Sequence, residues 1–269
     1  MTDSPPVEAA KAPVFPERRV VLLGASNLIR GISTVVGTAT QVWGGPLDVL
    51  AATGHGRSFG RDSRVFVRRL PAILECGLWD DLARRPPAAT AGLITDIGND
   101  ILYGFSAEQI ADWVRICLER LGPVCERIVV TELPLASVRE LDRVRFLLMR
   151  KLLFPKSELQ LADALASAEE LNERVVELAA RYGAHVVRPQ RHWFGFDPIH
   201  IKLPHWPSAW GEIFSSWRDD APLVRTSTSW RRWWRLRSLR PQRREWWGVE
   251  QHQPQPAARL DDGSLISFF

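Results

Sequence analysis

A serine follows a short apolar stretch near the start of the chain. Val20 to Leu23 are four consecutive apolar residues that end at Gly24, which predicts a fully buried strand. Ser26 therefore falls at the carboxyl end of this strand, where an open parallel sheet collects ligands and catalytic groups. A helix that starts after Ser26 would place its hydroxyl and backbone N–H at a helix N-terminus, which favours developing negative charge. Ser26 is a candidate nucleophile, and a simple helix N-cap is the alternative.

Two segments that contain glycine follow the next two candidate strands. Residues 53–58 read Thr-Gly-His-Gly-Arg-Ser, and these glycines allow close backbone approach and leave an N–H free to point into a site. Residues 96–100 read Asp-Ile-Gly-Asn-Asp, and the side-chain amide of Asn99 can donate a hydrogen bond to an oxyanion. Both segments also have the composition of turns, so an ordinary turn is the alternative for each.

A carboxylate and an imidazole lie three residues apart further along the chain. Asp197 can accept a hydrogen bond from one ring nitrogen of His200. That bond would fix the tautomer so that the other ring nitrogen faces a serine. A solvated loop with an incidental Asp–His pair is the alternative.

In this order, the four segments resemble the conserved blocks of the SGNH (GDSL-type) hydrolase family. The resemblance covers residues 20–201. It implies that Ser26 is the nucleophile, that His200 is the general base, and that Asp197 orients His200. It also implies a three-layer α/β sandwich with a five-strand parallel sheet.

The resemblance further implies an oxyanion hole with three donors. These are the backbone N–H of the nucleophile Ser26, the N–H of Gly56 and the side-chain amide of Asn99. Gly54 is the alternative to Gly56, which is preferred because the Gly-Arg-Ser that starts there follows the family's second block more closely. Two residues depart from the family's pattern: Ala25 replaces an aspartate, and Ile97 replaces a glycine. The second departure bears on the position of the Asn99 amide.

Three further residues are candidates for the substrate pocket. They are His55, Arg57 and Trp193. Arg57 could meet an anionic group or pair with a structural carboxylate, and Trp193 could instead belong to the core. His192 and His205 have no second ligand at metal spacing, so no metal ion or other cofactor is expected.

Short apolar runs alternate with longer helical patterns along the chain, which predicts a parallel sheet covered on both faces. The resemblance to the SGNH family implies that this sheet belongs to a flavodoxin-like α/β sandwich. Ser106 and Gln109 form a capping box at the start of one helix. The expected strands are 20–23, 47–52, 92–95, 128–131 and 184–187, and the expected helices include 107–121, 138–153 and 159–182.

The composition is that of an ordinary globular protein. Of 269 residues, 45% are hydrophobic and 25% are charged, and no apolar run reaches the ~18–20 residues that span a bilayer. The N-terminal segment lacks the apolar region of a secretory signal. An odd number of cysteines argues against a disulfide framework, so a cytoplasmic location is expected. The cysteines are Cys76, Cys117 and Cys125.

The chain divides into three parts by composition. Residues 1–17 are polar and proline-rich and are expected to be disordered. Residues 18–218 form the hydrolase-like domain, and residues 219–269 form an Arg/Trp-rich appendage. Between residues 225 and 247, eight arginines and one glutamate give a charge of +7, which leaves −3 for the rest of a chain whose total is +4. The basic character is therefore local.

The Arg/Trp-rich stretch has three interpretations. Trp230, Trp233 and Trp234 share one face of a helix. They could pack against the domain while the arginines stay solvated. They could instead make weak contact with an anionic membrane through residues 225–247. Nucleic acid is the least favoured partner.

Two hypotheses about function follow. The first is a serine esterase or acyl hydrolase of SGNH type, whose substrate is an ester of a small molecule, a glycan or a lipid. The alternative is a catalytically degenerate domain that acts as a peripheral membrane or partner-binding module through residues 219–269.

Overall fold

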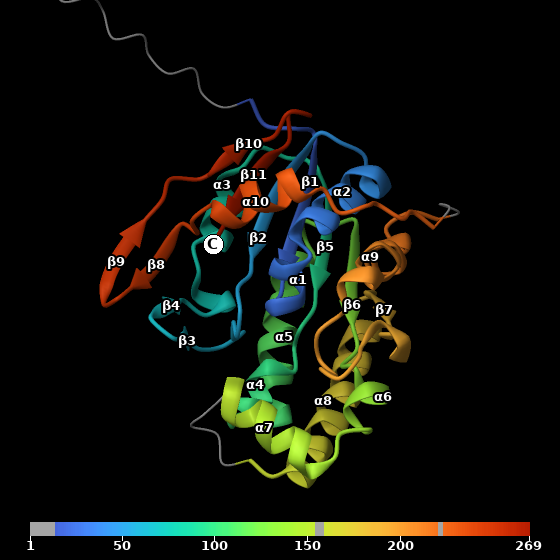
Figure 1. Ribbon diagram of the computed structural model, residues 1–269. Coiled ribbons are helices and arrows are strands. Elements are labelled where there is room, and N and C mark those ends of the chain that lie inside the picture. Colours follow the sequence, from blue (N-terminus) through green and yellow to red (C-terminus); the bar gives the residue numbers. More distant parts are fainter. Residues whose placement is uncertain (1–13, 154–158, 220–222) are drawn as a thin grey trace, which may run out of the picture.

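The computed structural model describes residues 14–153, 159–219 and 223–269, so most of the segment expected to be disordered lies outside the described residues. Its centre is a seven-stranded sheet with the order β10-β11-β2-β1-β5-β6-β7 (Figure 1). All neighbours in this sheet pair in parallel except β10 and β11. The strands are β1 (Arg18–Leu23), β2 (Leu47–Ala52), β5 (Ala89–Ile94), β6 (Arg127–Thr131), β7 (His185–Val187), β10 (Ala258–Arg259) and β11 (Leu265–Phe268).

Alternate strand residues point into two separate cores, as the two-residue period of a strand requires. On β1, Val20 and Leu22 belong to one core, and Val21 and Leu23 belong to the other. The first core is covered by α2 (Ile32–Trp43), α9 (Trp206–Ser215) and α10 (Trp230–Ser238), and the second by α3 (Leu78–Arg84), α5 (Ala107–Leu121) and α8 (Leu161–Arg181). The predicted three-layer α/β fold is confirmed.

The expected elements are present with small shifts at their ends. All five expected strands lie in the sheet, which contains two strands more than predicted. Ser106 caps the N-terminus of α5 as predicted, since its Oγ accepts a hydrogen bond from the N–H of Gln109 at 3.2 Å. The helix expected over 138–153 is divided into α6 (Leu135–Val138) and α7 (Arg143–Leu153). Two short helices follow strands at the site: α1 (Ser26–Arg30) and α4 (Asn99–Leu102).

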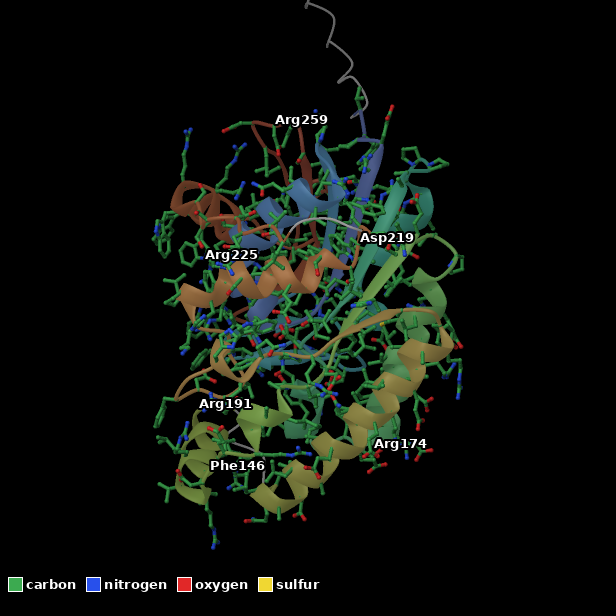
Figure 2. All side chains as sticks on the ribbon, turned by 90° about the vertical axis from the view of Figure 1, so that its right-hand side faces the viewer. Phe146, Arg174, Arg191, Asp219, Arg225 and Arg259 are labelled. Carbon is green, nitrogen blue, oxygen red and sulfur yellow. The ribbon has the colours of Figure 1, made fainter. Side chains whose placement is uncertain are left out.

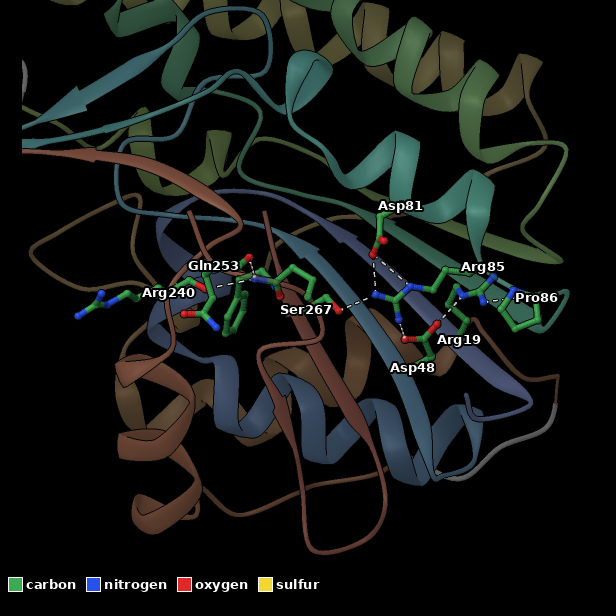
Figure 3. A network of polar contacts seen from close by, with 10 residues as sticks. Arg19, Asp48, Asp81, Arg85, Pro86, Arg240, Gln253 and Ser267 are labelled. Carbon is green, nitrogen blue, oxygen red and sulfur yellow. Dashed lines mark hydrogen bonds and ion pairs between the residues drawn. The ribbon is translucent and has the colours of Figure 1, made fainter. Parts of the chain in front are cut away.

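The C-terminal region is built into the sheet, which differs from the expected appendage. Strand β11 pairs in parallel with β2. A buried polar network holds them together (Figure 3): Asp48 on β2 forms ion pairs with Arg19 and Arg85, and Arg85 donates a hydrogen bond to Ser267 on β11 at 2.8 Å. A buried charge without partners costs several kcal/mol, so this network specifies the position of β11.

A second sheet lies beside the loop that follows β2 (Figure 1). Its strand order is β3-β4-β8-β9, so a hairpin after β2 pairs with a hairpin near the end of the chain. Arg68 on β4 is the register partner of Trp246 on β8. Its strands are β3 (Ser63–Val65), β4 (Arg68–Leu70), β8 (Arg243–Trp246) and β9 (Val249–His252).

Part of the Arg/Trp-rich stretch packs against the domain through α10. Leu236 is fully buried, and Trp233 donates a hydrogen bond from Nε1 to the carbonyl oxygen of Arg30 at 2.9 Å. Trp230 and Trp234 remain 53% and 69% exposed. Among the helices of the described segments, none has the length and apolar character needed to cross a bilayer.

Candidate active site

The site lies where three neighbouring parallel strands end. The carboxyl ends of parallel strands meet at one edge of a sheet, and here β1 lies between β2 and β5. Ser26 follows β1, Gly56 follows β2 and Asn99 follows β5. The two loops that contain the predicted donors therefore flank Ser26 from opposite sides. Residues 25–28 form the turn that contains Ser26, which we call the serine turn. Thr53 connects the loop after β2 to this turn, because its hydroxyl donates to the carbonyl oxygen of Ala25 at 2.9 Å.

The structure brings the predicted serine, histidine and aspartate into one hydrogen-bonded row. Nε2 of His200 lies 2.8 Å from Oγ of Ser26, and Nδ1 of His200 lies 2.5 Å from Oδ2 of Asp197. The other carboxylate oxygen of Asp197 accepts from the N–H groups of Ile199 and His200, both at 3.2 Å. Ser26 lies 174 residues before His200 in the chain, so only the fold brings the serine to the Asp197–His200 pair.

The environment of Asp197 favours its charged form. Burial alone would raise the pKa of Asp197, but its hydrogen bond and attraction to His200, with the N–H of Ile199, together hold this pKa below its usual value. An ionised carboxylate accepts the Nδ1 proton of His200. The lone pair of Nε2 then faces the hydroxyl of Ser26, as a general base requires.

Asp96 organises the backbone around the serine, a role that the sequence did not reveal. Its Oδ2 accepts from the amides of Ala25 at 3.0 Å, Asn27 at 2.9 Å and Leu28 at 3.3 Å. Asp96 has a φ of +59°, a left-handed conformation that directs the carboxylate to this turn. Of the four consecutive amides in this described turn, only that of Ser26 does not bind Asp96.

Asn27 connects the serine turn to the histidine loop. Its side-chain oxygen accepts from the N–H of Ile201, and its side-chain nitrogen donates to the carbonyl oxygen of Ile199, both at 2.8 Å. The same nitrogen donates to Oδ1 of Asp96 at 2.8 Å. The two residues that flank His200 are therefore held by the residue that follows Ser26. A side-chain amide directly after a candidate nucleophile was the one sequence signal for this role.

The predicted oxyanion donors occupy different surroundings. Nδ2 of Asn99 is buried and has no hydrogen-bond partner among the described residues, and Asn99 lines the same cavity as Ser26. Gly56 has a φ of +62°, and its carbonyl oxygen accepts from the hydroxyl of Tyr103 at 2.6 Å, which fixes this peptide. Ile97, the departure from the family's pattern, is buried and contributes to the wall of the cavity.

An apolar cavity of about 140 Å³ extends from Ser26 on the β5 and β6 side of the site. Trp193, predicted for the substrate pocket, lines it and is buried. Phe146 reaches the cavity from α7, at the end of the molecule opposite Arg259 (Figure 2). Other apolar lining residues include Ile97, Ile101, Leu133, Val138 and Ala168.

The other two pocket candidates lie outside this cavity. Arg57 is fully buried and donates hydrogen bonds to the carbonyl oxygens of Phe269 and Thr53, so it joins the C-terminal strand to the loop after β2 and presents no surface to a substrate. His55 is half-buried on the β2 side of Ser26. Burial, reinforced by the charges of Arg68 and Arg237, lowers the pKa of His55 to about 4.

The depressed pKa of His55 predicts a loss of stability in acid. Between pH 6.5, the ordinary value, and pH 4 the unfolded chain binds a proton that the folded protein does not. The free energy of unfolding should therefore fall by about 2 kcal/mol over this window. His55→Gln should lack this component in denaturant titrations at both pH values, whereas the exposed control His185→Gln should retain it. An identical acid loss in His55→Gln would contradict the prediction.

Two further histidines, His192 and His205, lie near each other. The rings of His192 and His205 lie 5.4 Å apart. Within the described residues no group of three or more histidine, cysteine, aspartate or glutamate side chains is placed to hold a metal ion.

No protein-family model and no curated protein sequence matches this chain. Solved structures resemble it in fold. One is a member of the lipolytic G-D-S-L family from Veillonella parvula DSM 2008, with 10% identity over 74% of this chain and 94% of that chain and a TM-score of 0.45. At such identity the likeness is one of fold, and the function depends on the geometry of the site.

Two further structures are similar to the same extent. The aryl esterase of M. smegmatis is 16% identical over 73% of this chain and 94% of that chain, with a TM-score of 0.47. TesA is 13% identical over 74% of this chain and 98% of that chain, with a TM-score of 0.46.

Proposed function

We propose that this protein is a serine hydrolase of the SGNH type that cleaves carboxylic esters. The observation that supports this proposal most directly is the hydrogen-bonded row of Ser26, His200 and Asp197 beside an apolar cavity. A nucleophile, a base within hydrogen-bond reach and a group that orients the base are the parts that acyl transfer needs.

Acylation begins at the serine hydroxyl. His200 Nε2 accepts the proton of Ser26 Oγ as this oxygen bonds to the ester carbonyl carbon, and the carbonyl oxygen becomes an oxyanion. Collapse of the tetrahedral intermediate breaks the bond to the alcohol oxygen, which leaves with the proton from His200. In the second half, His200 takes a proton from water, whose oxygen bonds to the acyl carbon. The bond from this carbon to Ser26 Oγ then breaks, Oγ recovers the proton from His200, and the acid is released. Asp197 keeps the imidazole in one tautomer throughout.

Three groups are proposed to stabilise the oxyanion. Asn99 contributes its unpartnered side-chain N–H, and Ser26 contributes the backbone N–H that Asp96 does not bind. Gly56 contributes its N–H from the other side of the serine. One such donor is worth about 2.7–4 kcal/mol in the transition state.

The alternative of a degenerate domain that binds a membrane is less favoured by the geometry. A degenerate site has no reason to keep Ser26, His200 and Asp197 aligned at hydrogen-bond distance. The exposed Trp230 and Trp234 are compatible with an interfacial role beside catalysis, and contact with an anionic membrane stays a hypothesis.

The cavity predicts a preference for longer acyl chains. Each methylene group that enters an apolar cavity gains about 0.8 kcal/mol, or roughly fourfold in kcat/KM. In a series of 4-nitrophenyl esters, kcat/KM should rise by about this factor per methylene from acetate onwards until the cavity is full. A spectrophotometric assay of released nitrophenolate measures it.

A pair of variants on α8 tests the assignment of this cavity to the acyl chain. Ala168 lines the cavity, so Ala168→Leu should shift the optimum to shorter chains. Ala180 is exposed on the same helix, and Ala180→Leu should leave the optimum unchanged. A chain-length profile that is flat in the unmodified protein would contradict the acyl assignment, and no hydrolysis of any ester in the series would contradict the proposed function.

A further inference from the structure

A group of basic side chains lies on the side of Ser26 opposite the cavity. The cavity is reached from the loops after β5 and β6, whereas His55 follows β2 on the other flank of β1. We name His55, Arg30, Arg68 and Arg237 the basic cluster. They come from four separate parts of the chain: the loop after β2, helix α1, strand β4 and helix α10.

Three contacts join the elements of the basic cluster. Nη2 of Arg68 lies 3.4 Å from the carbonyl oxygen of His55. The guanidinium of Arg237 lies over the ring of Trp233, 4.7 Å from its centroid. Trp233 in turn donates to the carbonyl oxygen of Arg30 at 2.9 Å. The C-terminal region therefore contributes directly to the surroundings of the site.

The arginines of the basic cluster have no acidic partners in the described chain. Arg69, Arg235 and Arg243 close by in sequence each form an ion pair with a carboxylate. By contrast, none of the described carboxylates lies within ion-pair distance of Arg30, Arg68 or Arg237. Three cations that repel one another and lack counter-ions are costly to hold together unless an anion binds.

The basic cluster lies close enough to the hydrogen-bonded row of Ser26, His200 and Asp197 for their charges to interact. After burial, the charges that lower the pKa of His55 come from Arg68, Arg237, His200 and Arg30. All four are bases, and one of them is the histidine that lies 2.8 Å from Ser26. An anionic group bound at the cluster would thus lie close to the reacting bond.

We propose that the basic cluster binds an anionic group, a phosphate or a carboxylate, on the alcohol side of the ester while the acyl chain fills the apolar cavity. This inference rests on the proposed esterase function and specifies its substrate class. Arginine presents paired N–H donors that match the oxygens of phosphate and carboxylate, so these anions suit the cluster. The substrate is then an ester with an apolar acid and an anionic alcohol.

Matched esters test on which side of the scissile bond, alcohol or acyl, the enzyme accepts a negative charge. The hexanoyl ester of 4-hydroxybenzoate has its carboxylate on the alcohol side, and the hexanoyl ester of methyl 4-hydroxybenzoate is its neutral counterpart. The monophenyl ester of adipic acid has its carboxylate on the acyl side. We expect kcat/KM for the first ester to exceed that for the second by about tenfold or more, and the third to be the poorest substrate, because its charge would enter the apolar cavity.

Variants test whether the arginines cause the preference. Arg68→Gln and Arg237→Gln should each lower the ratio of kcat/KM for the anionic and neutral esters by about fivefold, and Arg68→Lys should restore part of it. Arg231→Gln is the matched control, because Arg231 is exposed on the same helix as Arg237 and lies outside the cluster; it should keep the ratio. Raising the salt concentration from about 50 mM to about 500 mM should lower the ratio in the unmodified protein.

A second pair of esters identifies the carrier of the anion. 1-Decanoylglycerol 3-phosphate and 1-decanoylglycerol in neutral detergent micelles present the anion on a lipid. A preference for the phosphate would show a lipid headgroup to be accepted, and a preference confined to the benzoate pair would indicate a water-soluble alcohol.

The outcomes distinguish this inference from the proposed function. Hydrolysis of the neutral hexanoyl ester without a preference for either anionic alcohol would overturn the basic cluster as a binding site and leave the esterase intact. An unchanged ratio in both arginine variants would do the same. A preference for the adipate ester would overturn the assignment of sides. Failure to hydrolyse any ester would instead overturn the proposed function.

Discussion

Replacement of Ser26 by alanine is expected to reduce kcat/KM for an aryl ester by at least about 10⁴-fold, or about 5.4 kcal/mol in transition-state free energy. The change removes the only oxygen that lies 2.8 Å from Nε2 of His200 in the described structure. The fold should survive, because Ser26 Oγ makes no other hydrogen bond to the described residues and the turn is held by Asp96. The unfolding temperature should therefore change little.

A fluorophosphonate probe measures the same assignment without a substrate. The probe should form one covalent adduct, which mass spectrometry of the digested protein places on Ser26, and Ser26→Ala should not react. Ser238→Ala is a suitable control, since Ser238 is exposed on α10 and its hydroxyl bonds only to its own helix. Full aryl esterase activity in Ser26→Ala, or an adduct on another serine, would refute the nucleophile assignment.

Local patterns were enough to predict the central layers. The apolar runs of β1 and β2 are buried on both faces, and such continuous apolar runs predict strands of a parallel sheet. Strand β11 could not be predicted in this way, because four residues without a following helix give no periodic signal. Its place depends on β2 and on the Arg85 network, which are distant in the sequence. Likewise, a bend between α6 and α7 interrupts a pattern that suggested one helix.

At the site, the sequence indicated which residues can react but not how they are held. Ser26, His200 and Asp197 were recognised by residue type and order. The supports Asp96 and Asn27 act through bonds to backbone groups of other segments, which no spacing rule reveals. Arg57 was predicted to line the pocket or to pair with a structural carboxylate, but it is fully buried and donates to backbone carbonyl oxygens.

Asp96→Asn should lower both the stability and the catalytic activity, although asparagine has nearly the same shape as aspartate and differs in one carboxylate oxygen, which becomes an NH₂ group. The carboxylate accepts four hydrogen bonds: three from backbone amides to Oδ2 and one from the Asn27 side chain to Oδ1. An asparagine must direct its NH₂ group at one of these two sets of donors, so those donors lose their acceptor. Buried donors left without partners, together with the lost charge, should lower the free energy of unfolding by about 2–4 kcal/mol.

The catalytic effect of Asp96→Asn should exceed what partial unfolding explains. Because Asp96 positions both the serine turn and Asn27, which holds the loop of His200, kcat/KM should fall by about 10²–10³-fold at temperatures where the variant is fully folded. The rate of fluorophosphonate labelling at Ser26 should fall in parallel, while Asp112→Asn, on the exposed face of α5, should alter neither rate nor stability noticeably. A folded Asp96→Asn variant with unchanged labelling would mean that the serine turn keeps its geometry without this carboxylate, and the positioning role would then be wrong.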